Sequence, residues 1–251
     1  MRSLTKVRFG SIHADAVTFR EAVDYIIDLV REGHGGYVVT PNVDHIVLAE
    51  GDEGLRLAYA DASLSLADGM PLIWMAKLLR TKIPEKVSGS DIMMPLIERA
   101  AQDGLRVYFL GGAPGVAEAA SATLLTKLPT LQICGHDAPP LGFERDPAVL
   151  QKVIDTAKAA KPHLIFVALG CPKQELFMRM VRRDLAPSVL LGIGASLDFI
   201  AGVQSRSPAW MSRVGLEWTY RMMKDPKRLA HRYLVRDRAI AGIFLRQLMG
   251  R

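Results

Sequence analysis

Short apolar runs alternate with stretches of helical periodicity through the first 202 residues, and this alternation constrains the fold more than any other feature. The apolar runs end in Gly, Asn or Asp, as strands do where the chain leaves a sheet. Repeated strand–helix units of this kind place their strands side by side and cover them with helices. The sequence therefore predicts an α/β fold with a largely parallel sheet.

Local signals give the expected elements. The first clear helix begins after Thr18, because Thr18 and Glu21 have the spacing of a capping box, and it ends at Gly33. Strands are predicted at 37–40, 64–66, 106–110, 131–134, 163–169 and 189–193. Helices are predicted at 71–79, 147–160 and 172–183, and two more begin near residues 90 and 114. Beyond residue 202 the strand signals stop, and a mostly helical segment is expected.

Basic charge is concentrated in the last fifth of the chain. The whole chain has a net charge of +6, but residues 203–251 contain 11 Lys and Arg against 3 Asp and Glu, so this part carries +8 and the rest −2. We place the only domain boundary here, with a body at 1–202 and an appendage at 203–251. A nearly neutral body with a basic appendage predicts an anionic partner, such as a membrane surface, a nucleic acid or a phosphorylated ligand.

The appendage also has an apolar face. Ile240, Ile243, Phe244, Leu248 and Met249 form a stripe at helical spacing, and arginines flank it. Apolar groups on one face and arginines on the other are typical of a helix that lies at a membrane interface. The alternative is a solvated helix packed on its own domain. Nucleic-acid binding is not expected, because no nucleic-acid-binding module is visible.

Composition and residue spacing argue against a disulfide-rich protein, a signal peptide, a membrane-spanning helix and a histidine metal site. The two cysteines, Cys134 and Cys171, cannot form a disulfide framework, which favours a reducing compartment. The first ten residues lack the apolar core of a signal peptide, and no run of about 18 apolar residues predicts a membrane-spanning helix. The six histidines show no spacing that gathers metal ligands, although His45 lies beside a candidate loop. For Cys171, a buried thiol is favoured over a nucleophile.

The candidate site lies in the loops that follow the predicted strands, because ligands of parallel sheets bind at the carboxyl ends of the strands. Asp68 follows the strand at 64–66 and either takes a proton from a hydroxyl or caps the next helix. Thr40 and Asn42, in a neighbouring loop, either orient that hydroxyl or hold their own turn. Gln174 begins a later helix, where a sugar or phosphate would be reached.

Two glycine-containing loops are further candidates for ligand binding. Gly111 and Gly112 follow an apolar strand and precede a helix, so they form either an anion site or a tight turn. The loop with Gly194 and Ser196 also has two interpretations, which are anion binding and close packing of a strand on a helix. The chain contains no Asp-x-Asp, so a bound diphosphate would have to be neutralised by backbone dipoles and by Arg or Lys.

Seven segments, taken together and in order, resemble the WecG/TagA/CpsF family of bacterial glycosyltransferases. They are TPNVDH (40–45), ADGMP (67–71), PEKVSGSD (84–91), LGGAPGVAE (110–118), GCPKQE (170–175), GIGASLDFIAG (192–202) and SPAWMSRVGLEWTYR (207–221). The resemblance runs from about residue 8 to about residue 235. It implies a Rossmann-like body with helices on both faces and a C-terminal appendage that meets the membrane.

The resemblance also implies a reaction. Members move N-acetylmannosamine, its uronic acid or glucose from a UDP donor to a polyprenyl-diphosphate-linked acceptor, with inversion and with no metal or cofactor. It implies that Asp68 is the general base, that Thr40 and Asn42 orient the acceptor, and that Gln174 contacts the sugar. UDP is expected near Gly111, Gly112, Gly194 and Ser196, and the diphosphate-binding cations are expected to be Arg221, Arg228, Arg232 and Lys86, where Lys86 stands in place of the usual Arg.

The resemblance therefore implies a cytoplasmic, peripheral enzyme at the inner face of the cell membrane. Two other classes stay open. A nucleotide-binding oxidoreductase would need GxGxxG followed by an acidic residue about 20 positions later, which the Gly111 loop does not offer cleanly. A non-catalytic membrane adaptor would not require Asp68, Thr40 and Gln174 to meet in one cleft.

Overall fold

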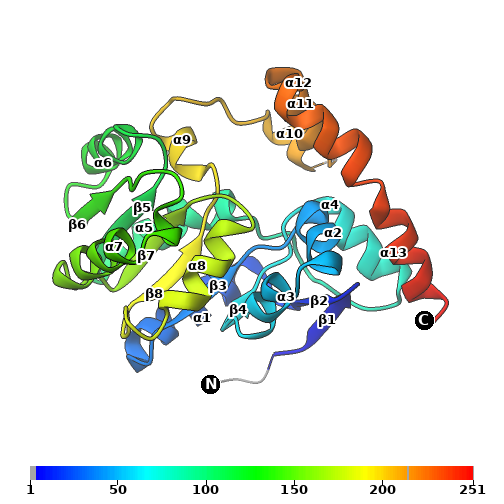
Figure 1. Ribbon diagram of the computed structural model, residues 1–251, viewed down its shortest axis with the longest axis horizontal. Helices are drawn as coiled ribbons and strands as arrows, with labels where there is room; N and C mark the ends of the chain where they lie inside the picture. The colour runs from blue at the N-terminus through cyan, green and yellow to red at the C-terminus, as the bar shows by residue number, and fades with distance from the viewer. Residues whose placement is uncertain (1–3, 214, 251) are drawn as a thin grey trace.

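A six-stranded parallel sheet forms the centre of the molecule, as the computed structural model of residues 4–213 and 215–250 shows (Figure 1). Its strands are β3 (Gly36–Val39), β4 (Leu64–Ser65), β5 (Arg106–Gly111), β6 (Gln132–Asp137), β7 (Leu164–Ala168) and β8 (Val189–Gly192). They lie in the order β4-β3-β8-β7-β5-β6, and every neighbouring pair is parallel. The predicted α/β fold is confirmed, and each strand overlaps its predicted range.

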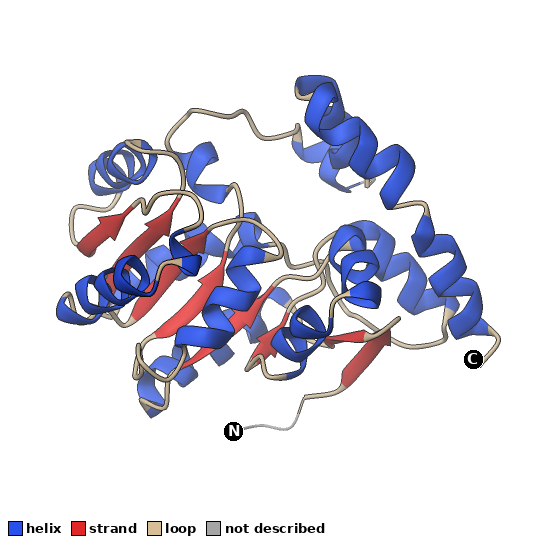
Figure 2. Ribbon diagram, in the orientation of Figure 1, coloured by secondary structure: helices blue, strands red, loops and turns tan. Residues whose placement is uncertain are grey.

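Helices cover both faces of the sheet (Figure 2). One face packs on α1 (Phe19–Glu32), α5 (Gly89–Gln102), α6 (Val116–Lys127) and α9 (Ser196–Ile200). The other packs on α2 (Val43–Gly51), α3 (Glu53–Ala60), α4 (Met70–Leu78), α7 (Pro147–Ala159) and α8 (Lys173–Val181). Alternate strand residues enter the two cores, so Phe109 and Phe166 face the first layer while Tyr108 and Ile165 face the second. The Rossmann-like arrangement is confirmed.

Local signals in the sequence explain several boundaries. Thr18 and Glu21 form the predicted capping box at the start of α1, and Gly33 ends that helix in the left-handed conformation at φ 71°. Asp146 caps α7 through two backbone N–H groups. A 3₁₀ turn, η1 (Phe143–Arg145), lies in the loop between β6 and α7.

An antiparallel hairpin precedes the sheet and was not predicted. It consists of β1 (Lys6–Phe9) and β2 (Ile12–Asp15), which together bury Val7, Phe9 and Ile12. Asp15 Oδ2 accepts a hydrogen bond of 2.8 Å from the backbone N–H of Ser65, which ties the hairpin to β4.

The C-terminal segment is helical, as predicted, with no strand among its described residues. It contains α10 (Ala209–Arg213), α11 (Glu217–Lys224), α12 (Pro226–His231), the π-helical turn η2 (Arg232–Arg236) and α13 (Ala239–Leu248). Figure 1 shows these helices running along one side of the molecule from α9 to the C-terminus. Within the described chain, no helix is both long and apolar enough to cross a bilayer.

Part of the predicted apolar stripe packs on the body of the protein. Ile243 is buried, and Ile240 and Phe244 lie against the core beside α2. Gln247 fixes this contact, because its Oε1 accepts from the backbone N–H of Gly10 at 2.9 Å and its Nε2 donates to the carbonyl of Arg8 at 2.7 Å. Leu248 and Met249 at the end of the stripe remain exposed. The stripe therefore divides between packing on the body and exposure to solvent.

Candidate active site

A cavity of about 770 Å³ lies at the carboxyl ends of β3, β7 and β8, and we call it the larger cavity. The loops after these strands and the start of the C-terminal segment form its walls. Its polar lining includes Thr40, Asn42, Asp68, Gln174, Gly194, Ser196, Arg221, Lys224 and Arg232. This is the edge where a parallel sheet of this type binds ligands, so the position agrees with the sequence-based expectation.

A second cavity, of about 330 Å³, lies between α4 and the C-terminal helices, and we call it the smaller cavity. Its walls contain the apolar side chains of Met70, Pro71, Trp218, Tyr233 and Ile240, the cations Lys86, Arg221 and Arg232, and the carboxylates Asp44, Asp68, Glu217 and Asp237. Asp68, Asn42, Ser90, Arg221 and Arg232 line both cavities. The two cavities therefore meet at a wall that carries one carboxylate and two guanidinium groups.

Asp68 occupies this junction because two adjacent loops are joined there. Its backbone N–H donates to the carbonyl of Pro41 at 2.9 Å, which links the loop after β4 to the loop after β3. Gly69 then adopts φ 108° as the N-cap of α4, and Pro71 lies in the first turn of that helix. No side-chain cap closes the start of α4, so the N-cap interpretation of Asp68 is not supported by the geometry. The carboxylate faces the two cavities instead.

The environment of Asp68 makes it easier to protonate. Burial in the cavity wall and the carboxylate of Glu217 raise the pKa of Asp68 to about 7, against the opposing effect of Lys86 and Arg221. A carboxylate with a pKa near neutrality accepts a proton better than an ordinary aspartate does. The raised pKa is compatible with the predicted role of Asp68 as a general base, which stays a prediction.

Thr40 and Asn42 flank this carboxylate in the loop that follows β3. Thr40 is buried and lines the larger cavity, whereas Asn42 lines both cavities. Asn42 is also the N-cap of α2, since its Oδ1 accepts from the backbone N–H of His45 at 3.3 Å. Asn42 therefore does hold its own turn, and its contact with the cavities leaves the acceptor-orienting role as a prediction.

Gln174 is fixed in the wall of the larger cavity by its neighbours. Its Nε2 donates to Oε1 of Glu175 at 2.7 Å, and its Oε1 accepts from the backbone N–H of Gly194 at 3.2 Å. The amide thus connects α8 to the loop after β8. Ser196, in the same loop, lines the cavity and donates its hydroxyl to the carbonyl of Ile193 at 2.5 Å.

Gly111 and Gly112 line neither of these cavities. The backbone N–H of Gly112 donates to the carbonyl of Ala168 at 3.0 Å, and a Cβ on Gly111 would lie 2.6 Å from that same oxygen. Their positive φ angles and this close approach explain why glycine is needed there. The geometry corresponds to the tight turn, and a nucleotide-binding role for the two glycines stays a prediction.

The predicted cations occupy different positions. Arg221 lines both cavities, with its guanidinium 3.1 Å from Glu217 Oε1 and 5.8 Å from the centre of the Phe199 ring. Lys86 lines the smaller cavity, and its Nζ donates to Asp91 at 2.6 Å. Arg206 also contacts Asp91. The side chain of Arg228 lies outside the described residues.

Arg232 is the cation held most firmly. It lines both cavities and contacts Asp44 Oδ2 at 3.1 Å, while Arg236 contacts the other oxygen of the same carboxylate. Asp44 is buried at the start of α2. We call these three residues the Asp44 clasp, because they join the C-terminal segment to the body. The sequence analysis did not identify Asp44, although it lies within the TPNVDH segment.

A parallel sheet with a cavity at its carboxyl edge, and a buried carboxylate where a second cavity opens, is compatible with a Rossmann-like group-transfer enzyme. The model of the family described as "Glycosyl transferase WecG/TagA/CpsF family" matches residues 7–251. The chain belongs to this family. The resemblance inferred from the seven segments is therefore confirmed.

Two curated relatives support the same class. A protein of Bacillus spizizenii (strain W23) is 29% identical over 197 residues, which cover 78% of this chain and 74% of the relative. A protein of Bacillus subtilis (strain 168) is 28% identical over 194 residues, which cover 77% and 73%. Both are named N-acetylglucosaminyldiphosphoundecaprenol N-acetyl-β-D-mannosaminyltransferase. The chain is an enzyme that transfers a sugar, which favours the glycosyltransferase interpretation over an oxidoreductase or an adaptor.

The pKa of Asp68 predicts the pH dependence of transfer. A general base must be ionised, so with a pKa of about 7 the active fraction falls as the pH drops below that value. We expect kcat/KM to fall roughly tenfold per pH unit below about pH 6.5 and to level off above about pH 8. Initial rates across this range measure it, and a flat profile between about pH 6 and 8 would contradict the role of Asp68.

Proposed function

We propose that the enzyme transfers an acetamido sugar from a UDP donor to a polyprenyl-diphosphate-linked acceptor, with inversion at the anomeric carbon. The observation that carries this proposal is the position of Asp68, where the larger and smaller cavities meet. A donor and an acceptor that occupy separate cavities can react only at such a junction. The one carboxylate needed for a single displacement lies there.

The larger cavity suits the donor. Its walls are mainly polar, and Arg221, Lys224 and Arg232 bring positive charge to a cavity that also contains backbone of the loop 193–196. These groups would neutralise the diphosphate without a metal. Gln174 would contact the sugar, because its amide is held at the wall of the same cavity.

The smaller cavity suits the acceptor. A polyprenyl diphosphate has an apolar chain and a strongly anionic head, and this cavity combines apolar walls with Lys86, Arg221 and Arg232. Each of these cations pairs with a carboxylate in the structure, so a bound diphosphate would compete with Asp91, Glu217 and Asp44 for them. The aromatic rings of Trp218 and Tyr233 lie edge to face, with 5.8 Å between their centres, and give the cavity a firm apolar side. An acceptor bound there would present its sugar hydroxyl toward Asp68.

The reaction follows from these positions. Asp68 removes the proton from the acceptor hydroxyl as the oxygen attacks the anomeric carbon, and the bond to UDP breaks on the opposite face. Thr40 and Asn42 orient the hydroxyl, and Arg221 and Arg232 stabilise the negative charge that develops on the leaving diphosphate. One displacement inverts the configuration, so an α-linked donor gives a β-linked product.

The names of the two relatives favour N-acetylmannosamine as the donor sugar and diphosphoundecaprenol-linked N-acetylglucosamine as the acceptor. A donor comparison tests this. The purified enzyme is incubated with a short-chain polyprenyl-diphosphate N-acetylglucosamine and with UDP-N-acetylmannosamine, its uronic acid or UDP-glucose in turn. We expect acceptor-dependent UDP release to be fastest with UDP-N-acetylmannosamine. The absence of acceptor-dependent release with all three donors would contradict the proposal.

We also propose that the C-terminal segment brings the enzyme to the inner face of the cytoplasmic membrane, where such an acceptor would be found. Met223, Leu234, Val235 and Leu245 are exposed apolar side chains of this segment. Lys227 and Arg238 are exposed cations among them. Exposed apolar groups beside cations favour binding to anionic lipid surfaces.

Vesicle binding tests the membrane role. The double variant Met223→Glu with Leu234→Glu is expected to lower partitioning onto anionic vesicles by about tenfold or more, because two apolar side chains no longer enter the interface. Leu141→Glu is the matched control, since Leu141 is 97% exposed but lies in the loop after β6. Sedimentation with vesicles measures the bound fraction. Equal binding by the double variant and the wild type would contradict the proposal.

A further inference from the structure

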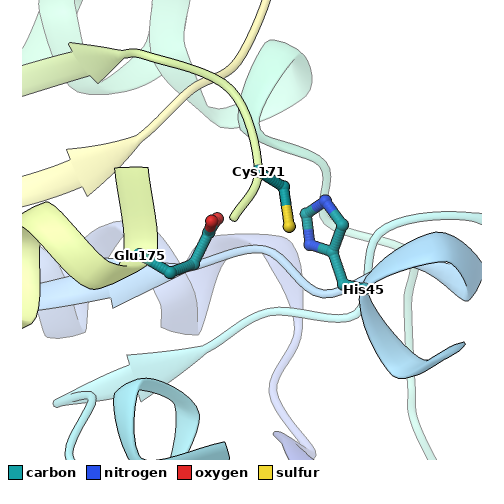
Figure 3. Close-up of side chains that lie close together, drawn as sticks. All are labelled: His45, Cys171 and Glu175. Carbon is teal, nitrogen blue, oxygen red and sulfur yellow. The ribbon is translucent and has the colours of Figure 1, made fainter. Parts of the chain in front are cut away.

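His45, Cys171 and Glu175 come together beside the larger cavity, although His45 lies 126 residues before Cys171 in the sequence. His45 lies in α2, Cys171 in the loop before α8, and Glu175 in the first turn of α8. Figure 3 shows the three side chains pointing toward one another. Their nitrogen, sulfur and oxygen atoms all lie within 4.8 Å of one another. His45 and Cys171 also line the larger cavity.

We propose that these three residues form a binding site for Zn²⁺ in the wall of the larger cavity, and that Zn²⁺ bound there inhibits transfer. The first half stands on the geometry of the cluster alone. The second half rests on the proposed function, because it concerns the donor cavity.

The ligand types fit Zn²⁺. Imidazole nitrogen, thiolate sulfur and carboxylate oxygen are its usual protein ligands, at about 2.0–2.3 Å, which places the ligand atoms of a tetrahedral site about 3.3–3.5 Å apart. Side-chain rotations that close the cluster by about 1 Å would reach this geometry. Three protein ligands leave a fourth position, which would face the cavity and hold water.

Glu175 shows an unused ligand atom. The side chain is fully buried, and its Oε1 accepts from Gln174 Nε2. Its Oε2 makes no hydrogen bond of good geometry within the described part of the chain, and the Cys171 thiol is the donor that lies near the carboxylate. A buried carboxylate oxygen without a partner is costly, and a cation at the cluster would remove that cost.

His45 is already arranged as a metal ligand. Its Nδ1 lies 2.7 Å from the hydroxyl of Tyr59, so Nε2 is the nitrogen left to bind a metal when Nδ1 donates its proton to Tyr59. Partners of this kind orient most metal-binding histidines. Burial, followed by the charge of Arg232, lowers the pKa of His45 to about 3, so the imidazole is neutral at ordinary pH. It can therefore bind a metal without first losing a proton.

The Cys171 thiol must lose its proton to bind the metal. Burial and the neighbouring Glu175 carboxylate raise the pKa of this thiol. A bound Zn²⁺ would stabilise the thiolate and the carboxylate together, and the thiol proton would leave to solvent.

Inhibition follows from the place of the cluster in the wall of the larger cavity. Glu175 would bind Zn²⁺ through Oε2 while its Oε1 contacts Gln174, so the metal would lie beside the Gln174 amide. Gln174 is the residue proposed to contact the donor sugar. The metal and its fourth ligand would also occupy space beside the donor, so transfer should slow while Zn²⁺ is bound.

The two cysteines of the chain supply a matched pair of variants. Co²⁺ is added to metal-free wild type, Cys171→Ser and Cys134→Ser, and the thiolate-to-cobalt charge-transfer absorption is followed before and after Zn²⁺ is added. Cys134 lies on β6, away from the cluster, and its Sγ donates to the carbonyl of Val107. We expect one Co²⁺ per chain with this absorption, displaced by Zn²⁺, in the wild type and in Cys134→Ser. In Cys171→Ser the absorption should be absent.

Zn²⁺ affinity and transfer complete the test. Competition with a chelator should show that Cys171→Ser and Glu175→Gln bind Zn²⁺ more than about 100-fold more weakly, since even partners of metal ligands change affinity by about 10–100-fold. Zn²⁺ should slow UDP release by the wild type, a chelator should restore it, and Cys171→Ser should resist the effect relative to its own metal-free rate.

Each contrary outcome has a distinct meaning. Thiolate absorption that persists in Cys171→Ser, or that is lost in Cys134→Ser, would overturn the site. Tight Zn²⁺ binding with an unchanged transfer rate would overturn the inhibitory half. Absence of transfer by the metal-free wild type would overturn the proposed function. The cobalt result would still decide whether the metal site exists.

Discussion

Replacing Asp68 with Asn is expected to lower kcat for transfer by about 10²–10⁴-fold, because the amide keeps the size of the side chain but cannot accept the proton of the acceptor hydroxyl. Binding of UDP should be unchanged, since the larger cavity keeps its other walls. Steady-state rates and UDP titrations by calorimetry measure the two quantities. The separation of catalysis from binding is the result that identifies a base.

Asp184→Asn is the matched control, because Asp184 is an exposed aspartate that lines neither described cavity. It should transfer sugar at the rate of the wild type. The Asp68→Asn variant should also lose the pH dependence that the wild type shows near pH 7. A rate within about threefold of the wild type would assign the base to another group.

Replacing Asp44 with Asn is expected to release the C-terminal helices from the body. Asp44 is buried and contacts both Arg232 and Arg236. The side chains of Arg232 and Arg236 are 25% and 37% exposed, and Asp237 lies 4.0 Å from Arg232, so water and Asp237 compensate part of the lost charge. We therefore expect the substitution to cost about 1–3 kcal/mol. Transfer to the lipid-linked acceptor should also fall when the C-terminal helices are released, since Arg232 lines both cavities.

Asp61→Asn is the control for the Asp44 clasp. Asp61 also contacts two arginines, Arg179 and Arg182, but its side chain is 33% exposed. An exposed pair of this kind contributes about 0–1 kcal/mol. Hydrogen exchange should show faster exchange in α13 of Asp44→Asn, and near wild-type exchange in Asp61→Asn. Equal protection of α13 in both variants would contradict the role of the Asp44 clasp.

The sequence predicted the sheet well because the strands that form it are continuous apolar runs with glycine at their ends. β5 and β7 are examples, since both are buried on two faces. The hairpin β1–β2 was missed because its strands have only four residues each, and charged residues such as Lys6 and Arg8 alternate with its buried ones. Its stability comes from packing against the body, which local signals do not contain.

The candidate site was predictable where one residue follows one strand. Asp68 and Thr40 follow strand ends, Gln174 begins the helix after β7, and the parallel sheet brings all three to one cavity. The contacts between distant segments were not predictable. Nothing in the sequence places His45 beside Cys171, or Asp44 beside Arg232, because only the folded chain brings α2 beside the loop before α8 and beside the C-terminal helices.

A glycine after an apolar strand has two physical causes in this structure, contact with a cavity and close approach of another strand. The sequence alone does not distinguish them. Gly194 lines the larger cavity, whereas Gly111 is required by the close approach of β7. Both follow apolar strands and both have positive φ. The difference comes from strand order, since β8 lies between β3 and β7 at the cavity while β5 lies one strand further out.

The product made by the wild-type enzyme tests the central claim most directly. UDP-N-acetylmannosamine and a short-chain polyprenyl-diphosphate N-acetylglucosamine are incubated with the enzyme, and the lipid product is analysed by mass spectrometry and NMR. The account predicts the addition of one acetamido sugar through a β linkage, with an equal amount of UDP released. UDP release without a glycosylated lipid, or an α-linked product, would contradict it.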